Sequence, residues 1–110
     1  MKESEIWQVN FSGEGHEYIG RRPAVIIQSD KQLKITSVVS IMPLTSKVTN
    51  RQVDDIFVST SSKNNLFHNS LIKVHHIQSF DKVRFIKKIG DLESEIIMEV
   101  KLYLQKHFGI

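Results

Sequence analysis

The sequence predicts a mainly β domain, a small barrel or sandwich of five or six short strands followed by an amphipathic helix. Two patterns support this. Most of the chain consists of short alternating or β-branched runs separated by polar turns, whereas the last twenty residues repeat their apolar positions every three or four residues. The length of 110 residues, with 40% hydrophobic and 25% charged residues, is typical of one globular domain.

The expected strands begin with an alternating run in which Trp7, Val9 and Phe11 share one face. The six predicted strands are residues 5–11, 23–28, 35–44, 53–60, 70–79 and 82–89. Residues 59–69 form the only long polar stretch and are expected to be a loop between the fourth and fifth strands. The final helix should end at Gly109, a usual stop residue after a last helical turn.

Composition limits the possible classes of protein. With no cysteine, the chain has no disulfides, no thiolate nucleophile and no cysteine-based metal site. Its longest unbroken apolar run, Ala24 to Ile27, is too short to cross a membrane. The first twenty residues contain acids and no hydrophobic signal segment, so we expect a cytoplasmic protein.

Charge is concentrated in the middle of the chain. Residues 31–90 carry ten basic and three acidic side chains, whereas residues 1–30 carry three and five, and residues 91–110 carry two and four. A basic segment on a folded domain suggests a polyanionic partner such as nucleic acid, although a solvated lysine face has the same composition.

A glycine-rich segment, residues 12–20, connects the first two predicted strands and contains three of the five glycines. It lacks the Gly-Lys-Ser/Thr of a phosphate-binding P-loop. Two interpretations remain open at this stage. The segment is either a simple hairpin connection or a lid that carries His16 and Glu17 over a site.

A second candidate site follows from strand pairing. If residues 23–28 and 35–44 form a hairpin whose turn centres near residues 33 and 34, Arg22 and Thr45 face each other. A guanidinium and a hydroxyl at one end of a sheet could bind a phosphate, with Arg21 and Ser46 beside them. The alternative is a surface arginine near a threonine that caps a strand.

A third segment, Lys73-Val74-His75-His76, falls in the predicted fifth strand. Alternation places Lys73 and His75 on the outer face, opposite Val74. Adjacent histidines on a strand point to opposite faces and cannot share one metal ion, so we expect no metal site.

Three parts of the sequence resemble the PemK/MazF family of endoribonuclease toxins from bacterial toxin–antitoxin modules. The resemblance lies in Glu5-Ile6-Trp7-Gln8-Val9-Asn10-Phe11, in Gly15-His16-Glu17-x-x-Gly20-x-Arg22-Pro23-Ala24-Val25-Ile26-Ile27-Gln28 and in Pro43-Leu44-Thr45-Ser46, and it continues through the later strands and the closing helix. The Gly-x-Arg-Pro segment is the most specific part.

This resemblance implies an SH3-like barrel of five to six strands, seven at most, that forms a homodimer. It also implies cleavage of single-stranded RNA without a metal or other cofactor, and a cognate antitoxin that blocks the substrate groove. By the same resemblance Arg22, Thr45 and Glu17 are catalytic, and His16 has a counterpart in some members. Arg22 would stabilise the charged transition state while Thr45, assisted by Ser46, holds a phosphate oxygen.

The chain departs from the family pattern near His75, where relatives often carry an acid, and at Gln78, where they carry arginine. We therefore expect His75 to lie in the substrate groove and to be a candidate general base, with Glu17 and His16 as its rivals. Arg21, Lys73 and Gln78 are expected to contact substrate. The alternative function is a non-catalytic barrel of the same fold that acts by binding a protein, as a gyrase poison or a degenerate toxin.

Overall fold

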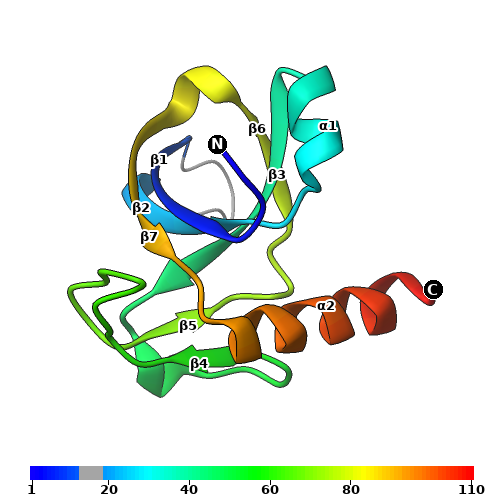
Figure 1. The fold of residues 1–110 in the computed structure, drawn as a ribbon. Coiled ribbons are helices and arrows are strands. Elements are labelled where there is room, and N and C mark those ends of the chain that lie inside the picture. Colours follow the sequence, from blue (N-terminus) through cyan, green and yellow to red (C-terminus); the bar gives the residue numbers. More distant parts are fainter. Residues whose placement is uncertain (13–18) are drawn as a thin grey trace.

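The computed structural model describes residues 1–12 and 19–110, which form an antiparallel β-sheet, two α-helices and two short 3₁₀ helices (Figure 1). The strands are β1 (Glu5–Ser12), β2 (Ile19–Ile26), β3 (Val38–Thr45), β4 (Ile56–Val58), β5 (Ser70–Ile72), β6 (Gln78–Asp81) and β7 (Phe85–Asp91). The helices are α1 (Asp30–Ile35), α2 (Ser94–Phe108), η1 (Val48–Asn50) and η2 (Lys82–Arg84). The predicted mainly β fold with a C-terminal helix is confirmed.

The sheet is strongly curved and remains open (Figure 1). Its hydrogen-bonded order is β4-β5-β3-β2-β1-β7, and β6 pairs with β3 beside this path. In the described part of the chain no pairing joins β4 to β7, so the strands do not close into a complete barrel. β3 pairs with β2, β6 and β5 along its length, which makes it the strand that joins the two halves of the sheet.

Alternating side chains divide the interior into two hydrophobic clusters. Ile6 of β1 and Val25 of β2 face a cluster that also contains Val100 and Tyr103 of α2. Val9, their neighbour on the opposite face, belongs to a second cluster that is closed by α1 and the start of β7. The amphipathic pattern of the last twenty residues thus places α2 on one cluster, and Gly109 ends this helix in the left-handed conformation, as predicted.

The connection between β2 and β3 differs from the predicted hairpin turn centred near residues 33 and 34. It contains α1, whose N-cap Ser29 accepts a hydrogen bond from the backbone N–H of Gln32. The spacing of serine and glutamine here matches a capping box, a signal present in the sequence. The helix leaves the strand register intact, because its midpoint lies where the turn was expected. In the described chain neither helix is long and apolar enough to cross a membrane.

The predicted fifth strand, residues 70–79, is also wrong, because it is two strands. β5 ends at Ile72, residues 74 and 75 form a turn, and β6 starts at Gln78. The break occurs at Lys73, whose side chain is buried in an ion pair described below. The Lys73 backbone N–H still donates to the Pro43 carbonyl of β3, and the strand is interrupted after it by a turn in which the His76 N–H donates to the Lys73 carbonyl.

The loop between β4 and β5 lies where predicted, and it is firmly anchored. Asn64 is completely buried, and its side chain accepts hydrogen bonds from the backbone N–H groups of Ser61 and Leu66. Its amide nitrogen donates to Glu93 at the start of α2. Asn65 adopts the left-handed conformation, with φ 54°, and donates a hydrogen bond to the carbonyl of Ile89 in β7.

Gly90 of β7 allows this loop to approach the sheet. A Cβ atom at this position would lie 2.7 Å from the carbonyl oxygen of Lys63 and still closer to the carbonyl of Asn64. Both are backbone atoms that cannot rotate away. The loop can therefore lie directly on β7 only because residue 90 has no side chain.

Gly90→Ala should push the loop away from β7 and lower the free energy of unfolding by about 1–3 kcal/mol, as overpacking does. Urea unfolding of the purified protein measures this. Ile86→Thr, at an exposed position of the same strand, is the control and should change the value by less than about 0.5 kcal/mol. An alanine variant as stable as the parent would show that the loop shifts without cost.

Candidate functional site

A pocket of about 400 Å³ lies between the anchored loop and the end of the sheet formed by β2, β1 and β7. Its volume falls within the range of about 300–1,000 Å³ typical of small-molecule sites. The residues lining it are Gln8, Arg21, Arg22, Pro23, Leu44, Ser46, Asn65, Leu66, Phe67, His68, Ser70, Lys87, Lys88 and Ile89. Four of these described lining residues are lysine or arginine and none of them is acidic, so they favour an anion.

Three strands contribute to one wall of this pocket. Gln8 of β1 pairs with Pro23 of β2 on one side and with Lys87 of β7 on the other. Paired residues share a face of the sheet, and Arg21 lies on that face as well because it is two residues from Pro23. Arg21 and Lys87 are both exposed, so this wall presents cations to solvent.

Lys88 is more constrained than Lys87, because its ammonium lies 3.2 Å from both Glu5 and Asp91. Hydrogen bonds to these two carboxylates raise the pKa of Lys88. Burial by itself would raise the pKa of Glu5, but hydrogen bonds from Trp7 and the Lys2 backbone, with Lys88 beside them, hold it below its ordinary value. Lys88 thus stays protonated with much of its charge already balanced.

The predicted register of Arg22 and Thr45 agrees with the observed strand pairing. Ala24 pairs with Pro43 and Ile26 pairs with Ile41. The two residue numbers of each pair add up to 67, which is also the sum of 22 and 45. The observed pairing of β2 with β3 ends at Ala24 and Pro43, so the pairing of Arg22 with Thr45 stays a prediction. Arg22 lines the pocket, and it pairs with Val9 on the face of the sheet opposite that of Arg21.

Thr45 is 5% exposed and does not line the pocket, whereas the next residue, Ser46, is exposed and does. The Thr45 hydroxyl accepts a hydrogen bond from the backbone N–H of Lys47 at 3.2 Å. Since that bond uses the oxygen as acceptor, the hydroxyl hydrogen remains a donor. The structure therefore brings Arg21, Arg22 and Ser46 to one pocket, whereas Thr45 is buried and is not among the described lining residues.

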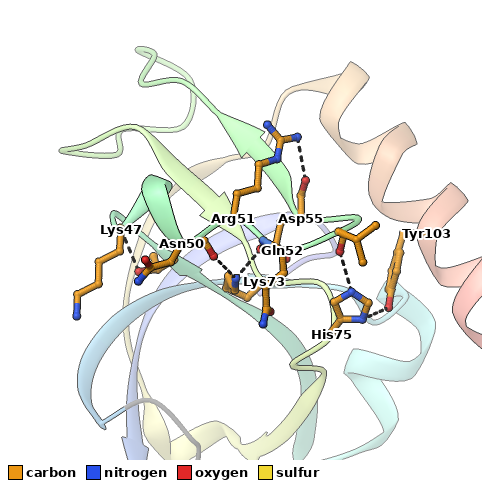
Figure 2. A network of polar contacts seen from close by, with 10 residues as sticks. Lys47, Asn50, Arg51, Gln52, Asp55, Lys73, His75 and Tyr103 are labelled. Carbon is orange, nitrogen blue, oxygen red and sulfur yellow. Dashed lines mark hydrogen bonds and ion pairs between the residues drawn. The ribbon is translucent and has the colours of Figure 1, made fainter.

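Lys73 is not on the outer face, contrary to the prediction. It is 4% exposed, and its ammonium lies 2.5 Å from the carboxylate of Asp55 and 3.3 Å from the carbonyl oxygen of Asn50 (Figure 2). The same carboxylate accepts a hydrogen bond from the backbone of Gln52, and Arg51 donates to the Asp55 carbonyl. Lys73 holds the 50–55 turn rather than facing solvent, and we withdraw it as a substrate contact.

His75 also differs from its predicted environment. It lies in the turn after β5 and is absent from the lining of the pocket. Its Nε2 is 2.8 Å from the carbonyl oxygen of Val53, and its Nδ1 is 3.0 Å from the hydroxyl of Tyr103 (Figure 2). Because a carbonyl only accepts, Nε2 donates to it, and a neutral His75 accepts from Tyr103. With both ring nitrogens engaged, His75 positions α2 and has no nitrogen left to take a substrate proton.

Tyr103 continues this contact to the end of the helix. Its hydroxyl also lies 2.8 Å from Nδ1 of His107, and because its one hydrogen goes to His75, the Nδ1–H of His107 donates to the hydroxyl oxygen. Burial, followed by the nearby charge of Asp54, raises the pKa of Tyr103 and keeps its proton in place. Gln78, a further predicted contact, lies on β6 opposite Ile41 and does not line the pocket.

His16 and Glu17, both predicted at the site, lie outside the described residues. The residues that the sequence analysis missed include Asn65, Phe67, His68 and Lys87. A signal for one of them existed. Phe67 is a large aromatic residue in an otherwise polar loop, and its side chain is 95% exposed.

The comparisons with known proteins agree with this fold. Residues 2–108 match the model of the PemK-like, MazF-like toxin of type II toxin-antitoxin systems. The chain belongs to this family. It is 26% identical over 111 residues to the Endoribonuclease MazF of Staphylococcus saprophyticus, a match that covers 100% of this chain and 92% of the relative.

Solved structures of the same kind resemble the whole chain. MazF from Deinococcus radiodurans superposes with a TM-score of 0.83 at 20% identity, covering 100% of this chain and 97% of the other. The Mycobacterium tuberculosis toxin MazF-mt6 gives 0.78 at 16% identity, covering 96% and 97%. A MazE–MazF structure from D. radiodurans gives 0.76 at 18% identity, covering 100% and 96%. The fold is therefore that of MazF toxins.

Lys73→Met should lower the free energy of unfolding by about 3–5 kcal/mol, because it leaves Asp55 buried without a counterion. The double variant Lys73→Met, Asp55→Leu should recover much of this loss, since it removes both charges. Urea unfolding measures both. Lys87→Met is the matched control and should change stability by less than about 0.5 kcal/mol. A Lys73→Met protein as stable as this control would mean that the ion pair does not hold the turn.

Proposed function

We propose that this toxin cuts single-stranded RNA at preferred sequences, using the ribose 2′-hydroxyl as nucleophile and no metal ion. The observation that carries the proposal is the cationic pocket at the end of β2, lined by Arg21, Arg22 and Lys87 with no acidic residue among its described lining. Family membership and the name of the Staphylococcus relative support the same reaction class.

The pocket suits a negatively charged, single-stranded substrate. A cationic groove attracts the phosphate backbone, and a duplex would need a wide complementary surface that an indented pocket does not offer. In the described chain no group of three or more histidine or acidic side chains is placed to hold a metal ion. Chemistry that needs only the substrate's own hydroxyl fits these residues.

In the proposed reaction the 2′-oxygen attacks the adjacent phosphorus as the bond to the 5′-oxygen breaks. The 2′-hydroxyl gives its proton to a general base, and the leaving 5′-oxygen takes up a proton. The products are a 2′,3′-cyclic phosphate and a 5′-hydroxyl. Arg22 would stabilise the charge that builds up on the phosphate oxygens, and the Thr45 hydroxyl would donate to one of them. Because His75 lies away from the pocket, Glu17 becomes the leading candidate for the general base, ahead of His16.

Purified protein should cut a mixed-sequence RNA in excess EDTA as fast as without it, and should leave the matching DNA intact because DNA lacks the nucleophile. Arg22→Lys should lower kcat by about 100-fold or more, since it removes the planar guanidinium donor while keeping the charge. Arg84→Lys is the matched control and should keep the parent rate, because Arg84 does not line the pocket. End mapping of the fragments gives the preferred sequence and the terminal phosphate.

Loss of cleavage in EDTA, or equal cleavage of DNA, would contradict the mechanism. Tight binding of RNA without any cleavage would instead favour the non-catalytic barrel. If Arg22→Lys and Arg84→Lys both retain the parent rate, the site has been assigned to the wrong residues.

We also propose that the toxin is a homodimer and that a cognate antitoxin neutralises it. Some of the solved relatives are MazE–MazF complexes, which supports an antitoxin partner. Large apolar side chains are exposed on α2 and on the neighbouring 53–57 segment: Val53, Phe57, Met98 and Leu102. Such a surface on a small domain is typical of a protein interface.

Leu102→Glu should therefore convert a dimer to a monomer at micromolar concentration, because it buries a charge in the proposed interface. Light scattering on the purified protein measures the mass. Val83→Glu, at another exposed apolar position on η2, is the control and should leave the dimer intact. A monomeric parent protein would remove the dimer from the proposal.

A further inference from the structure

We propose that Phe67 is a stacking platform for one base of the RNA, and so a residue that sets affinity and sequence preference. This rests on the proposed function, because it assigns a role within the same pocket. At 95% exposure, Phe67 is the most exposed of the large hydrophobic residues in the described chain. An aromatic ring held in water beside a ligand pocket is available to a ligand in a way that a core residue is not.

The position of Phe67 is fixed by its neighbours in the loop. Leu66, the preceding residue, is 8% exposed and packs in the first hydrophobic cluster. The Leu66 backbone N–H donates to the buried Asn64 side chain, and Asn65 is bonded to β7. The next residue, Phe67, lies outside the core on this anchored backbone. Because the supporting backbone is already ordered, binding a base on Phe67 would require little further ordering of the chain.

The surroundings of the ring indicate which ligand it would take. The residues that line the pocket with Phe67 include Arg21, Lys87 and His68, and none of the described lining residues is acidic. Proteins bind single-stranded nucleic acid with this combination, since cations follow the phosphates while aromatic rings stack on the bases. Charged side chains surround the ring, and such side chains are depleted at the centre of protein interfaces. The surroundings therefore favour RNA over a protein partner.

The relation between Phe67 and Arg22 limits where the base would lie. Both line the same pocket of about 400 Å³, with Arg22 on the strand side and Phe67 on the loop side. A base stacked on Phe67 would therefore belong to a nucleotide close to the one whose phosphate Arg22 contacts. Phe67 should influence which sequence is cut while taking no part in proton transfer.

The test compares side chains with and without an aromatic ring at this position. Phe67→Leu keeps an apolar group but removes the π-face, and Phe67→Trp restores it. The probe is a 2′-O-methyl RNA of the preferred sequence, which cannot be cut, with 2-aminopurine at each position in turn. We expect the 2-aminopurine fluorescence to be quenched at one position near the cleavage site. Phe67→Leu should lose this quenching and bind the RNA about 5- to 150-fold more weakly, whereas Phe67→Trp should keep the quenching.

On cleavable RNA, Phe67→Leu should raise KM by a similar factor and leave kcat within about threefold, because stacking contributes to binding rather than to chemistry. Phe108→Leu, at an exposed phenylalanine at the end of α2 that does not line the pocket, is the matched control and should leave KM unchanged. Thermal unfolding of Phe67→Leu should match the parent, since the ring is exposed.

The outcomes separate this inference from the proposed function. A parent protein that binds the probe with quenching but cuts nothing contradicts the proposed reaction and still supports Phe67 as a platform. Unchanged RNA affinity and unchanged KM in Phe67→Leu overturn the platform while leaving the reaction intact, and would point to a protein partner for the ring. A parent protein that neither binds nor cuts RNA overturns both.

Discussion

The buried side chain of Asn64 is the contact on which the candidate site depends. It accepts hydrogen bonds from two backbone N–H groups within the β4–β5 loop, and it donates to Glu93 at the start of α2. Burial would raise the pKa of Glu93, but hydrogen bonds from Ser61 and Asn64 hold it below the ordinary value and keep the acceptor charged. The loop wall of the pocket is thus a consequence of one satisfied buried amide.

A second polar anchor holds the 50–55 turn. Lys73 and Asp55 hold the 50–55 turn, and the His75–Tyr103 contact joins that turn to α2 (Figure 2). Both anchors use residues that could be mistaken for catalytic groups in the sequence. A lysine or histidine in a basic segment can equally be a structural residue whose partner is distant in the chain, and the hydrogen bonds of its side chain distinguish the two cases.

The sequence predicted the fold well where periodicity is local, as in β1 and α2, and simple counting of residues predicted the register between β2 and β3. It failed where a distant partner decides the outcome. Nothing near Lys73 in the chain shows that Asp55 will bury it, so residues 70–79 were predicted as one strand. The pocket was missed for the same reason, because its loop and β7 walls meet only in three dimensions.

The position of β1 between β2 and β7 has a consequence for synthesis of the chain. The ribosome makes β1 first, yet one of its two hydrogen-bonded edges waits for residues 85–91, and Ile6 shares its cluster with Val100 and Tyr103. Until the last segment emerges, the nascent toxin lacks the Lys87 wall, the Glu93 anchor and much of its core. Translation therefore has to finish before the pocket exists, so an incomplete chain carries no assembled site.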